Sequence, residues 1–270
     1  MKKWTKLTAI SLVLFFALGL TAGCSKQSNT QDKPLKVGVT AGPHAEVMDV
    51  VKKVAEKQGL KIEVIEFNDY IQPNVALSQG DIDVNSFQHQ PYLDNMVKDR
   101  NYDIVSVAKT VIFPMGIYSK KLKTLDDIKP GATIAVPNDP TNGGRALLLL
   151  EKVGLIKLKP NAGIKAAVTD IAENPKNLKI KELEAAQIPR SLEDVDVAAI
   201  NTNYAMTAGL VPTKDAIAIE DVNSPYANII AVKAANKDNP AVQKLVKAYQ
   251  SEEVKQFIKE HFKGSVAAGW

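Results

Sequence analysis

Strand-like and helix-like segments alternate along this 270-residue chain from Leu35 onward, and this alternation limits the fold more than any other feature. A β-rich run at residues 36–40 precedes Pro43, which suits the first turn of a helix. Valines then recur at helical spacing until Gly59, a residue typical of helix ends. The pattern continues to about residue 107 and starts afresh after Ile112. It predicts an α/β fold with doubly wound sheets.

The remaining elements divide the chain into two similar halves. Strands are expected at residues 62–65, 81–84, 104–107, 133–136, 178–180 and 195–200, and helices at 73–80, 92–100, 146–153 and, as two consecutive helices, 240–262. The length fits one large α/β domain or two modest ones. From length and pattern together we predict two lobes, one formed by residues 34–111 with 223–270 and the other by residues 112–222.

The first 33 residues predict export and anchoring rather than part of the folded body. Three lysines precede an apolar stretch at residues 7–20, which is shorter than the roughly 20 residues a membrane-spanning helix needs. The stretch ends in a sequence similar to a bacterial lipobox, so we expect a signal peptide at residues 1–23 and lipidation of Cys24. Residues 24–33 are polar and suit a tether. The alternative is that Cys24, which is the single cysteine, is an ordinary free thiol.

Composition and motifs argue against several classes of function. The formal charge is +4, but three of the lysines lie in the expected signal peptide, so the mature chain carries about +1 and lacks the basic excess of a nucleic-acid binder. HExxH, CxxC, P-loop and GxSxG motifs are missing from the sequence. We therefore expect no enzyme and no cofactor, although a scattered catalytic triad leaves no sequence signature. A metal site at His89 with Asp81 and Asp83 stays open as an alternative.

The segment at residues 137–145 is the strongest candidate for a ligand site. It joins an expected strand to an expected apolar helix, where open α/β sheets commonly bind ligands. Arg145 would lie in the first turn of that helix, where a cation is unfavourable unless it holds an anion such as a carboxylate. The alternative is a surface arginine on a helix capped by Thr141 or Asn142.

Two other segments add apolar and amide side chains. Phe87, His89 and Tyr92 crowd a junction between strand and helix, with Tyr70 shortly before them, and such rings could line a pocket for a thioether or simply belong to the core. The segments at 201–204 and 224–228 contribute amides, which offer both donors and an acceptor. The alternative is that these asparagines serve turns and helix caps.

Taken together, these segments resemble the NlpA-type methionine-binding lipoproteins of ABC importers. The resemblance covers nearly the whole chain. Besides the lipobox, it rests on the segments at residues 42–46, 69–74, 87–92, 137–142, 174–178, 201–205, 224–228 and 269–270.

The resemblance implies a two-lobed periplasmic-binding fold of type II, with methionine in the cleft between the lobes. It implies that Arg145 pairs with the ligand carboxylate, that amides hold the polar end and that rings surround the side chain. The residues concerned are Asn142, Asn203 and Asn228 for the polar end, with Asn201 competing with Asn203, and Tyr70, Phe87, His89 and Tyr92 for the side chain. The segment 113–115 varies in the family, so L-methionine, D-methionine and a methionine dipeptide all remain candidates.

The resemblance also implies partners and a location. The expected partners are an ABC permease with its ATPase, and the expected location is the cell membrane, through a lipid anchor, facing the periplasm or the cell exterior. We expect a monomer that binds no nucleic acid and no metal. The alternatives are an anchored binding or scaffold lipoprotein for another small amino acid or a metal, and a hydrolase.

Overall fold

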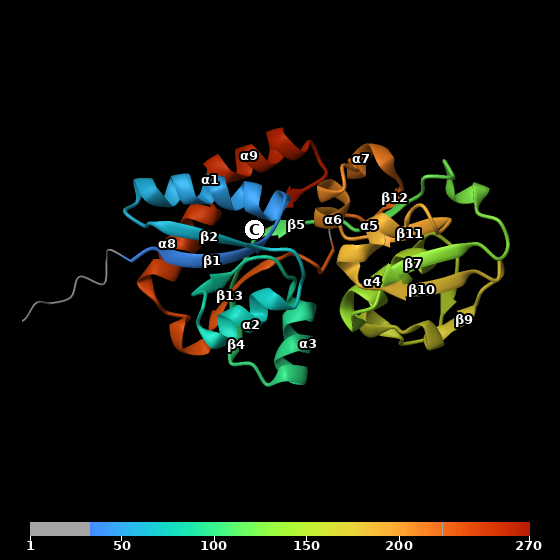
Figure 1. The fold of residues 1–270 in the computed structure, drawn as a ribbon, viewed down its shortest axis with the longest axis horizontal. Helices are drawn as coiled ribbons and strands as arrows, with labels where there is room; N and C mark the ends of the chain where they lie inside the picture. Colours follow the sequence, from blue (N-terminus) through green and yellow to red (C-terminus); the bar gives the residue numbers. More distant parts are fainter. Residues whose placement is uncertain (1–32, 223) are drawn as a thin grey trace, which may run out of the picture. The chain divides into compact units, whose positions relative to one another are not determined.

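Two five-stranded mixed sheets form the framework of the structure, a computed structural model that describes residues 33–222 and 224–270 (Figure 1). The first sheet has the order β2 (Ile62–Phe67), β1 (Leu35–Thr40), β3 (Val84–Asn85), β13 (Ile229–Lys233) and β4 (Ile104–Lys109). The second has the order β10 (Lys179–Leu183), β7 (Thr133–Pro137), β11 (Val197–Ile200), β6 (Gly116–Tyr118) and β12 (Ala216–Ile219). Residues 34–270 form one compact unit, and the expected signal peptide and Cys24 lie outside the described residues.

Both sheets contain parallel and antiparallel pairs. In the first, β1 is parallel to β2 and β3, whereas β13 is antiparallel to β3 and β4. In the second, β7 is parallel to β10 and β11, whereas β6 is antiparallel to β11 and β12. The alternation of strands and helices therefore predicted the α/β class, but not the direction of the strands that return from one sheet to the other.

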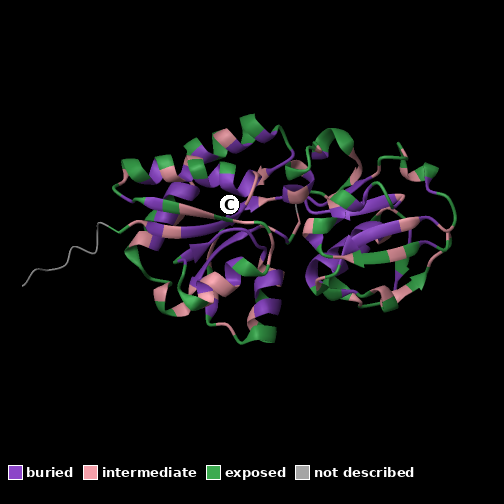
Figure 2. Cartoon of the chain, viewed as in Figure 1, coloured by how far each residue is buried: buried purple, intermediate pink, exposed green. Residues whose placement is uncertain are grey.

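Helices cover both faces of each sheet because the central strands are apolar on both faces. In β13, Ile230 and Val232 contribute to the core with α1 (Pro43–Lys57), α8 (Pro240–Tyr249) and α9 (Glu252–Phe262). The alternate residues Ile229 and Ala231 face the core with α2 (Gln72–Gln79) and α3 (Gln90–Arg100). This two-residue period is the geometry of a strand buried on both sides. Figure 2 shows the buried strands between helices whose outer faces are exposed.

The second sheet follows the same rule. In β11, Val197 and Ala199 face the core with α4 (Pro140–Lys152). Ala198 and Ile200 face the core with α5 (Ile188–Ser191) and α6 (Thr202–Thr207). A short helix, α7 (Pro212–Asp215), precedes β12. The apolar run expected to form a doubly buried strand does so, although it is shorter than the predicted 195–200.

Two segments connect the sheets. The first passes from β4 through β5 (Val111–Ile112) to β6, and the second runs from β12 to β13. β5 pairs with β14 (Ala267–Ala268), so the chain end contacts the first connection. A further two-stranded sheet joins β8 (Lys157–Leu158) and β9 (Ile171–Glu173).

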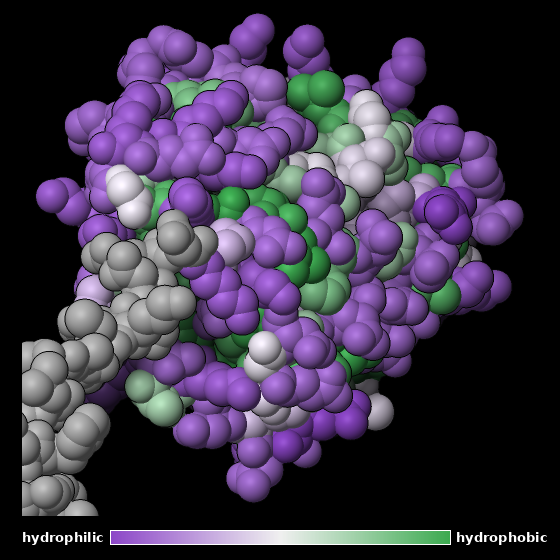
Figure 3. Space-filling view, turned by 60° about the vertical axis from the view of Figure 1, so that its left-hand side comes forward, coloured by the Kyte–Doolittle hydropathy of each residue, from purple (hydrophilic) through white to green (hydrophobic). Residues whose placement is uncertain are grey.

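The surface is mainly polar on the face that Figure 3 shows, with hydrophobic residues visible between the hydrophilic ones. In the described part of the chain, every helix is too short or too polar to cross a membrane.

Candidate functional site

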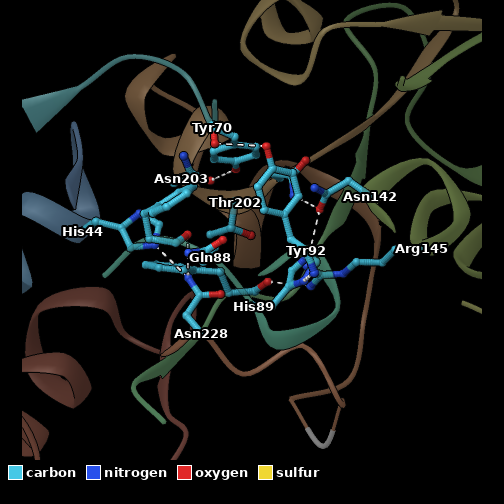
Figure 4. A pocket seen from close by; sticks show the side chains of 13 residues that line it. His44, Tyr70, Gln88, His89, Tyr92, Asn142, Arg145, Thr202, Asn203 and Asn228 are labelled. Carbon is cyan, nitrogen blue, oxygen red and sulfur yellow. Dashed lines mark hydrogen bonds between the residues drawn. The ribbon is translucent and has the colours of Figure 1, made fainter. Parts of the chain in front are cut away.

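One pocket brings together all the site residues expected from the sequence (Figure 4). They are Tyr70, Phe87, His89, Tyr92, Asn142, Arg145, Asn201, Asn203 and Asn228, and His44, Gln88, Phe113 and Thr202 complete the lining. The space between these side chains, including the part open to solvent, is about 340 Å³. The carboxyl ends of β1, β3, β7 and β11 lead into the segments that supply most of the lining.

The helix that carries Arg145 begins earlier than expected. α4 starts at Pro140 rather than near Ala146, because the Asp139 carboxylate accepts hydrogen bonds from the backbone N–H groups of Thr141 and Asn142. Asp139 is therefore the N-cap, and neither Thr141 nor Asn142 has that role. Arg145 lies in the second turn and not the first, so the expected conflict with the helix dipole is weaker than the sequence suggested.

Arg145 is buried and has a partner that the sequence did not reveal. Its Nε lies 2.9 Å from Oε1 of Glu220 and its Nη2 lies 2.5 Å from Oε2. Nη2 also donates to the backbone oxygen of Phe113, at 2.8 Å. The guanidinium carbon lies 4.3 Å from the centroid of the Tyr226 ring, a cation–π contact. These contacts leave Nη1 without a hydrogen bond to any described residue.

A chain of fixed donors and acceptors orients two asparagines on the same side of the pocket. Nδ2 of Asn142 donates to the Asp139 carboxylate at 2.9 Å, so Oδ1 of Asn142 faces the other way. This oxygen accepts from Nδ2 of Asn201 at 2.8 Å. The amide oxygen of Asn201 is left buried and without a partner among the described residues. Asn201 therefore presents an unpaired acceptor.

His89 reinforces this arrangement and also starts α3. Its Nδ1 accepts a hydrogen bond from the backbone N–H of Tyr92, so Nε2 carries the proton and donates to Oδ1 of Asn142 at 3.2 Å. As the N-cap, His89 sets the helix start at Gln90, two residues before the expected one. Burial, together with the smaller effect of the Arg145 charge, lowers the pKa of His89 from 6.5 to about 3, so the ring is neutral near pH 7.

Asn203 shows the opposite polarity. Its Oδ1 accepts a hydrogen bond from the Tyr70 hydroxyl at 2.6 Å, and its Nδ2 is buried with no partner in the described part of the chain. Burial raises the pKa of Tyr70 well above 10, which keeps its hydroxyl protonated as a donor. Both Asn201 and Asn203 line the pocket, so the geometry does not exclude either, and they expose opposite groups.

Three aromatic rings form an apolar wall beside these polar groups. The ring centroids of Tyr70, Phe87 and Tyr92 lie 5.9–6.2 Å from one another. The Tyr92 hydroxyl donates to the backbone oxygen of Tyr70, which ties the wall together. Phe87 and Tyr92 are buried with Met96 in a small core cluster of their own, and both rings also line the pocket.

Some residues of the site could not be found from the sequence, because their roles depend on contacts with residues far away along the chain. Gln88 lines the pocket, but its amide is engaged by Asn74 and Asn85 in a buried network. The sequence assigns no role to His44, although it lies in the segment 42–46, and none to Glu220, which is a single acid in a mixed segment. If Arg145 is expected to be buried, its charge needs a counter-charge, and this is the one sequence-based reason to look for an acid such as Glu220.

The alternative metal site is not formed. Asp81 and Asp83 are exposed, whereas His89 is buried in the pocket. Among residues 33–222 and 224–270, no group of three or more His, Cys, Asp or Glu side chains is placed to hold a metal ion.

Known proteins resemble this chain along nearly its whole length. The family model of the NlpA lipoproteins matches residues 35–270. A relative from Salmonella typhimurium, the D-methionine-binding lipoprotein MetQ, is 54% identical over 252 residues, which is 92% of this chain and 93% of the relative. MetQ from Escherichia coli strain K12 is 53% identical over 251 residues and 92% of each chain.

Solved structures agree in fold as well as in sequence. A nutrient binding protein from Burkholderia cenocepacia, bound to methionine, is 64% identical with a TM-score of 0.86, and the match covers 87% of this chain and 100% of that one. The crystal structure of the methionine binding protein MetQ is 54% identical with a TM-score of 0.86, covering 87% and 98% of the two chains.

Proposed function

Because this chain belongs to the NlpA lipoprotein family, we propose that it captures methionine outside the cytoplasm and delivers it to the permease of an ABC importer. The relatives named for methionine binding share half or more of its residues, and the family consists of binding proteins rather than enzymes. A role as a hydrolase therefore has no support from these relatives. A role as a carrier of another amino acid remains the second candidate and is tested by the ligand panel below.

The observation that carries this proposal is the set of unpaired polar groups in the pocket. Nδ2 of Asn203 is a buried donor and Oδ1 of Asn201 a buried acceptor, and neither has a partner among the described residues. Arg145 adds a further donor, Nη1, because its bonds to Glu220 and Phe113 use Nε and Nη2. Oδ1 of Asn228 is a second acceptor, because its Nδ2 is used by His44 and Phe87. Two donors suit a carboxylate and two acceptors suit an ammonium group, which together make an amino acid.

The apolar wall supports methionine over smaller amino acids. Tyr70, Phe87 and Tyr92 present ring faces and edges to the same pocket. A thioether contact with a ring contributes about 0.3–1.5 kcal/mol, and a long unbranched side chain reaches several rings at once. An alanine side chain would leave this wall without a contact.

Capture proceeds by closure of two lobes, which we assign to residues 34–111 with 223–270 and to residues 112–222. Tyr70 and His89 belong to the first, and they hydrogen-bond Asn203 and Asn142 of the second. A ligand that contacts both sets of residues favours the closed arrangement, which a permease can then distinguish from the open one.

Membership of a lipoprotein family also supports a lipid anchor at Cys24. Lipidation of Cys24 would hold the protein at the outer side of the cell membrane, close to the permease and its ATPase, with residues 24–33 as the tether. We propose that it acts there as a monomer. A single lipid chain binds a membrane only weakly, so the attachment needs more than one acyl group.

The decisive experiment is the identification of the ligand that the protein itself carries. Protein purified without denaturation is unfolded in acid, and the released small molecules are identified by mass spectrometry with chiral separation. Calorimetry on ligand-free protein then compares L-methionine, D-methionine, a methionine dipeptide and the other common amino acids. Methionine or its dipeptide as the tightest ligand supports the proposal, whereas preference for another amino acid, or no binding in the whole panel, would overturn it.

A further inference from the structure

The Asn228 amide can present either an acceptor or a donor to the pocket, and two neighbours decide which. Its Nδ2 lies 3.2 Å from the backbone oxygen of Phe87 and 2.8 Å from Nε2 of His44. A carbonyl oxygen only accepts hydrogen bonds, so the amide nitrogen and not the amide oxygen must face Phe87. Oδ1 is thereby directed away from both neighbours, and no described residue donates to it.

The same argument fixes the protonation of His44. Since Nδ2 of Asn228 donates to Nε2, this ring nitrogen carries no hydrogen, and the proton lies on Nδ1. Nδ1 is 2.7 Å from the hydroxyl oxygen of Thr40, to which it donates. Figure 4 shows His44 and Asn228 joined on one side of the pocket.

His44 has no hydrogen-bonding capacity left for a ligand, although it lines the pocket. Both ring nitrogens are engaged with the protein, and the ring packs edge-on against Phe113 with centroids 4.5 Å apart. The ring is buried on α1, immediately after the turn at Gly42. Burial also lowers its pKa to about 3, which keeps it neutral and able to accept through Nε2. If His44 affects which polar groups of a ligand the pocket accepts, it must therefore do so through Asn228.

We propose that His44 is a positioning residue that holds the Asn228 amide with its oxygen toward the pocket and so selects ligands that carry an ammonium group. The proposal rests on the proposed function, because it assumes that an amino acid occupies this pocket. Without an acceptor at the Nε2 position, the second hydrogen of Nδ2 loses its partner, and the longer 3.2 Å bond to the backbone oxygen of Phe87 is the one contact left to hold the amide. Asn228 would then no longer present a fixed acceptor.

Two substitutions of similar polarity separate this role from simple packing. In His44→Gln, the amide oxygen can reach the position of Nε2 and accept from Asn228. In His44→Asn, the shorter amide reaches only the position of Nδ1, so it can bond Thr40 but not Asn228. The probes are methionine and 4-(methylthio)butanoate, which is methionine without its ammonium group.

Calorimetry measures the preference of each variant for methionine over the butanoate. A hydrogen bond to a charged group changes affinity by about 10- to 100-fold. We expect His44→Asn to reduce the preference at least tenfold, with butanoate binding changed less than about threefold, and His44→Gln to stay within about threefold of wild type. An unchanged preference in His44→Asn, or an equal loss in both variants, would overturn the role of His44.

The tautomer of His44 gives a test that needs neither a variant nor a ligand. Long-range ¹H–¹⁵N spectra of ¹⁵N-labelled wild-type protein should show the ring protonated at Nδ1. A proton on Nε2 would contradict the proposal even if the His44→Asn variant failed to fold. Wild-type protein that binds no methionine would instead overturn the proposed function, so the two failures are distinguishable.

Discussion

Arg145 and Glu220, 75 residues apart in sequence, form a buried ion pair whose side chains are 3% and 11% exposed. Glu220 also accepts a hydrogen bond from the backbone N–H of Met115, and Arg145 donates to the backbone oxygen of Phe113. The pair thus touches both segments that connect the two sheets, while Nη1 of Arg145 faces no described partner. The cation that we assign to the ligand carboxylate is held in place by the connecting segments themselves.

Glu220→Gln should destabilise the ligand-free protein, because it leaves the buried Arg145 charge without a counter-charge. We expect the free energy of unfolding to fall by about 3–5 kcal/mol in urea denaturation at pH 7. The matched control is Glu253→Gln, which breaks the exposed pair with Lys57 and should change stability by less than about 1 kcal/mol. Similar small effects in both variants would mean that burial of the Arg145–Glu220 pair contributes little.

Arg145→Ala should weaken methionine binding by about 2–5 kcal/mol, as expected for loss of one partner of a buried charge pair with the ligand. Calorimetry at 25 °C measures the change, with circular dichroism as a check that the variant is folded. Arg190→Ala removes an exposed arginine from the same half of the chain and should leave the affinity unchanged. An unaltered methionine affinity in Arg145→Ala would reject the carboxylate contact.

Phe87→Ala should affect methionine far more than alanine as a ligand. The ring contacts only a side chain long enough to reach the wall, so we expect a loss of about 1 kcal/mol for methionine, within the range of a thioether–ring contact, and little or no loss for alanine. Competition binding against a labelled methionine gives both values. Equal losses would show that Phe87 supports the fold of the pocket and not the ligand side chain.

Tyr70→Phe should weaken closure, because it removes the hydroxyl that donates to Oδ1 of Asn203. We expect methionine affinity to fall about tenfold, mainly through faster dissociation, in line with the loss of one buried hydrogen bond of about 1 kcal/mol or more. Stopped-flow fluorescence measures the dissociation rate. Tyr102→Phe, at a half-buried tyrosine outside the pocket, provides the control and should leave the rate as in wild type.

Stability should fall as the pH falls below 6.5. Burial lowers the pKa of both His44 and His89 to about 3 in the folded protein, whereas the unfolded chain binds protons near 6.5. Between these values the unfolded state binds protons that the folded state excludes, so each histidine lowers the free energy of unfolding by about 1.4 kcal/mol per pH unit. Urea denaturation from pH 7 to pH 4 measures the slope. In the His44→Gln variant the slope should be smaller by the contribution of one histidine. Equal slopes in the variant and the wild type would contradict a neutral His44 in the folded protein.

Much of the fold could be predicted because local rules act over a few residues. The proline at position 43 and the glycine at position 80 bound helices where the sequence placed them. The helix start at Pro140 could also have been predicted from the sequence, since the pair Asp139-Pro140 supplies both the cap and the first helical residue. The direction of β13 could not be predicted, because it depends on which sheet the returning chain joins and on the strands that it then pairs with.

The sequence by itself determined the class of fold, the apolar strands and which side chains were candidates for a pocket. The tertiary structure decided how those side chains pair: which acid neutralises Arg145, and which end of each amide is left unpaired. The reason is physical, since periodicity and capping act between residues that are near in sequence. Hydrogen bonds such as that between His44 and Asn228 join residues 184 positions apart and exist only once the strands that carry them have met.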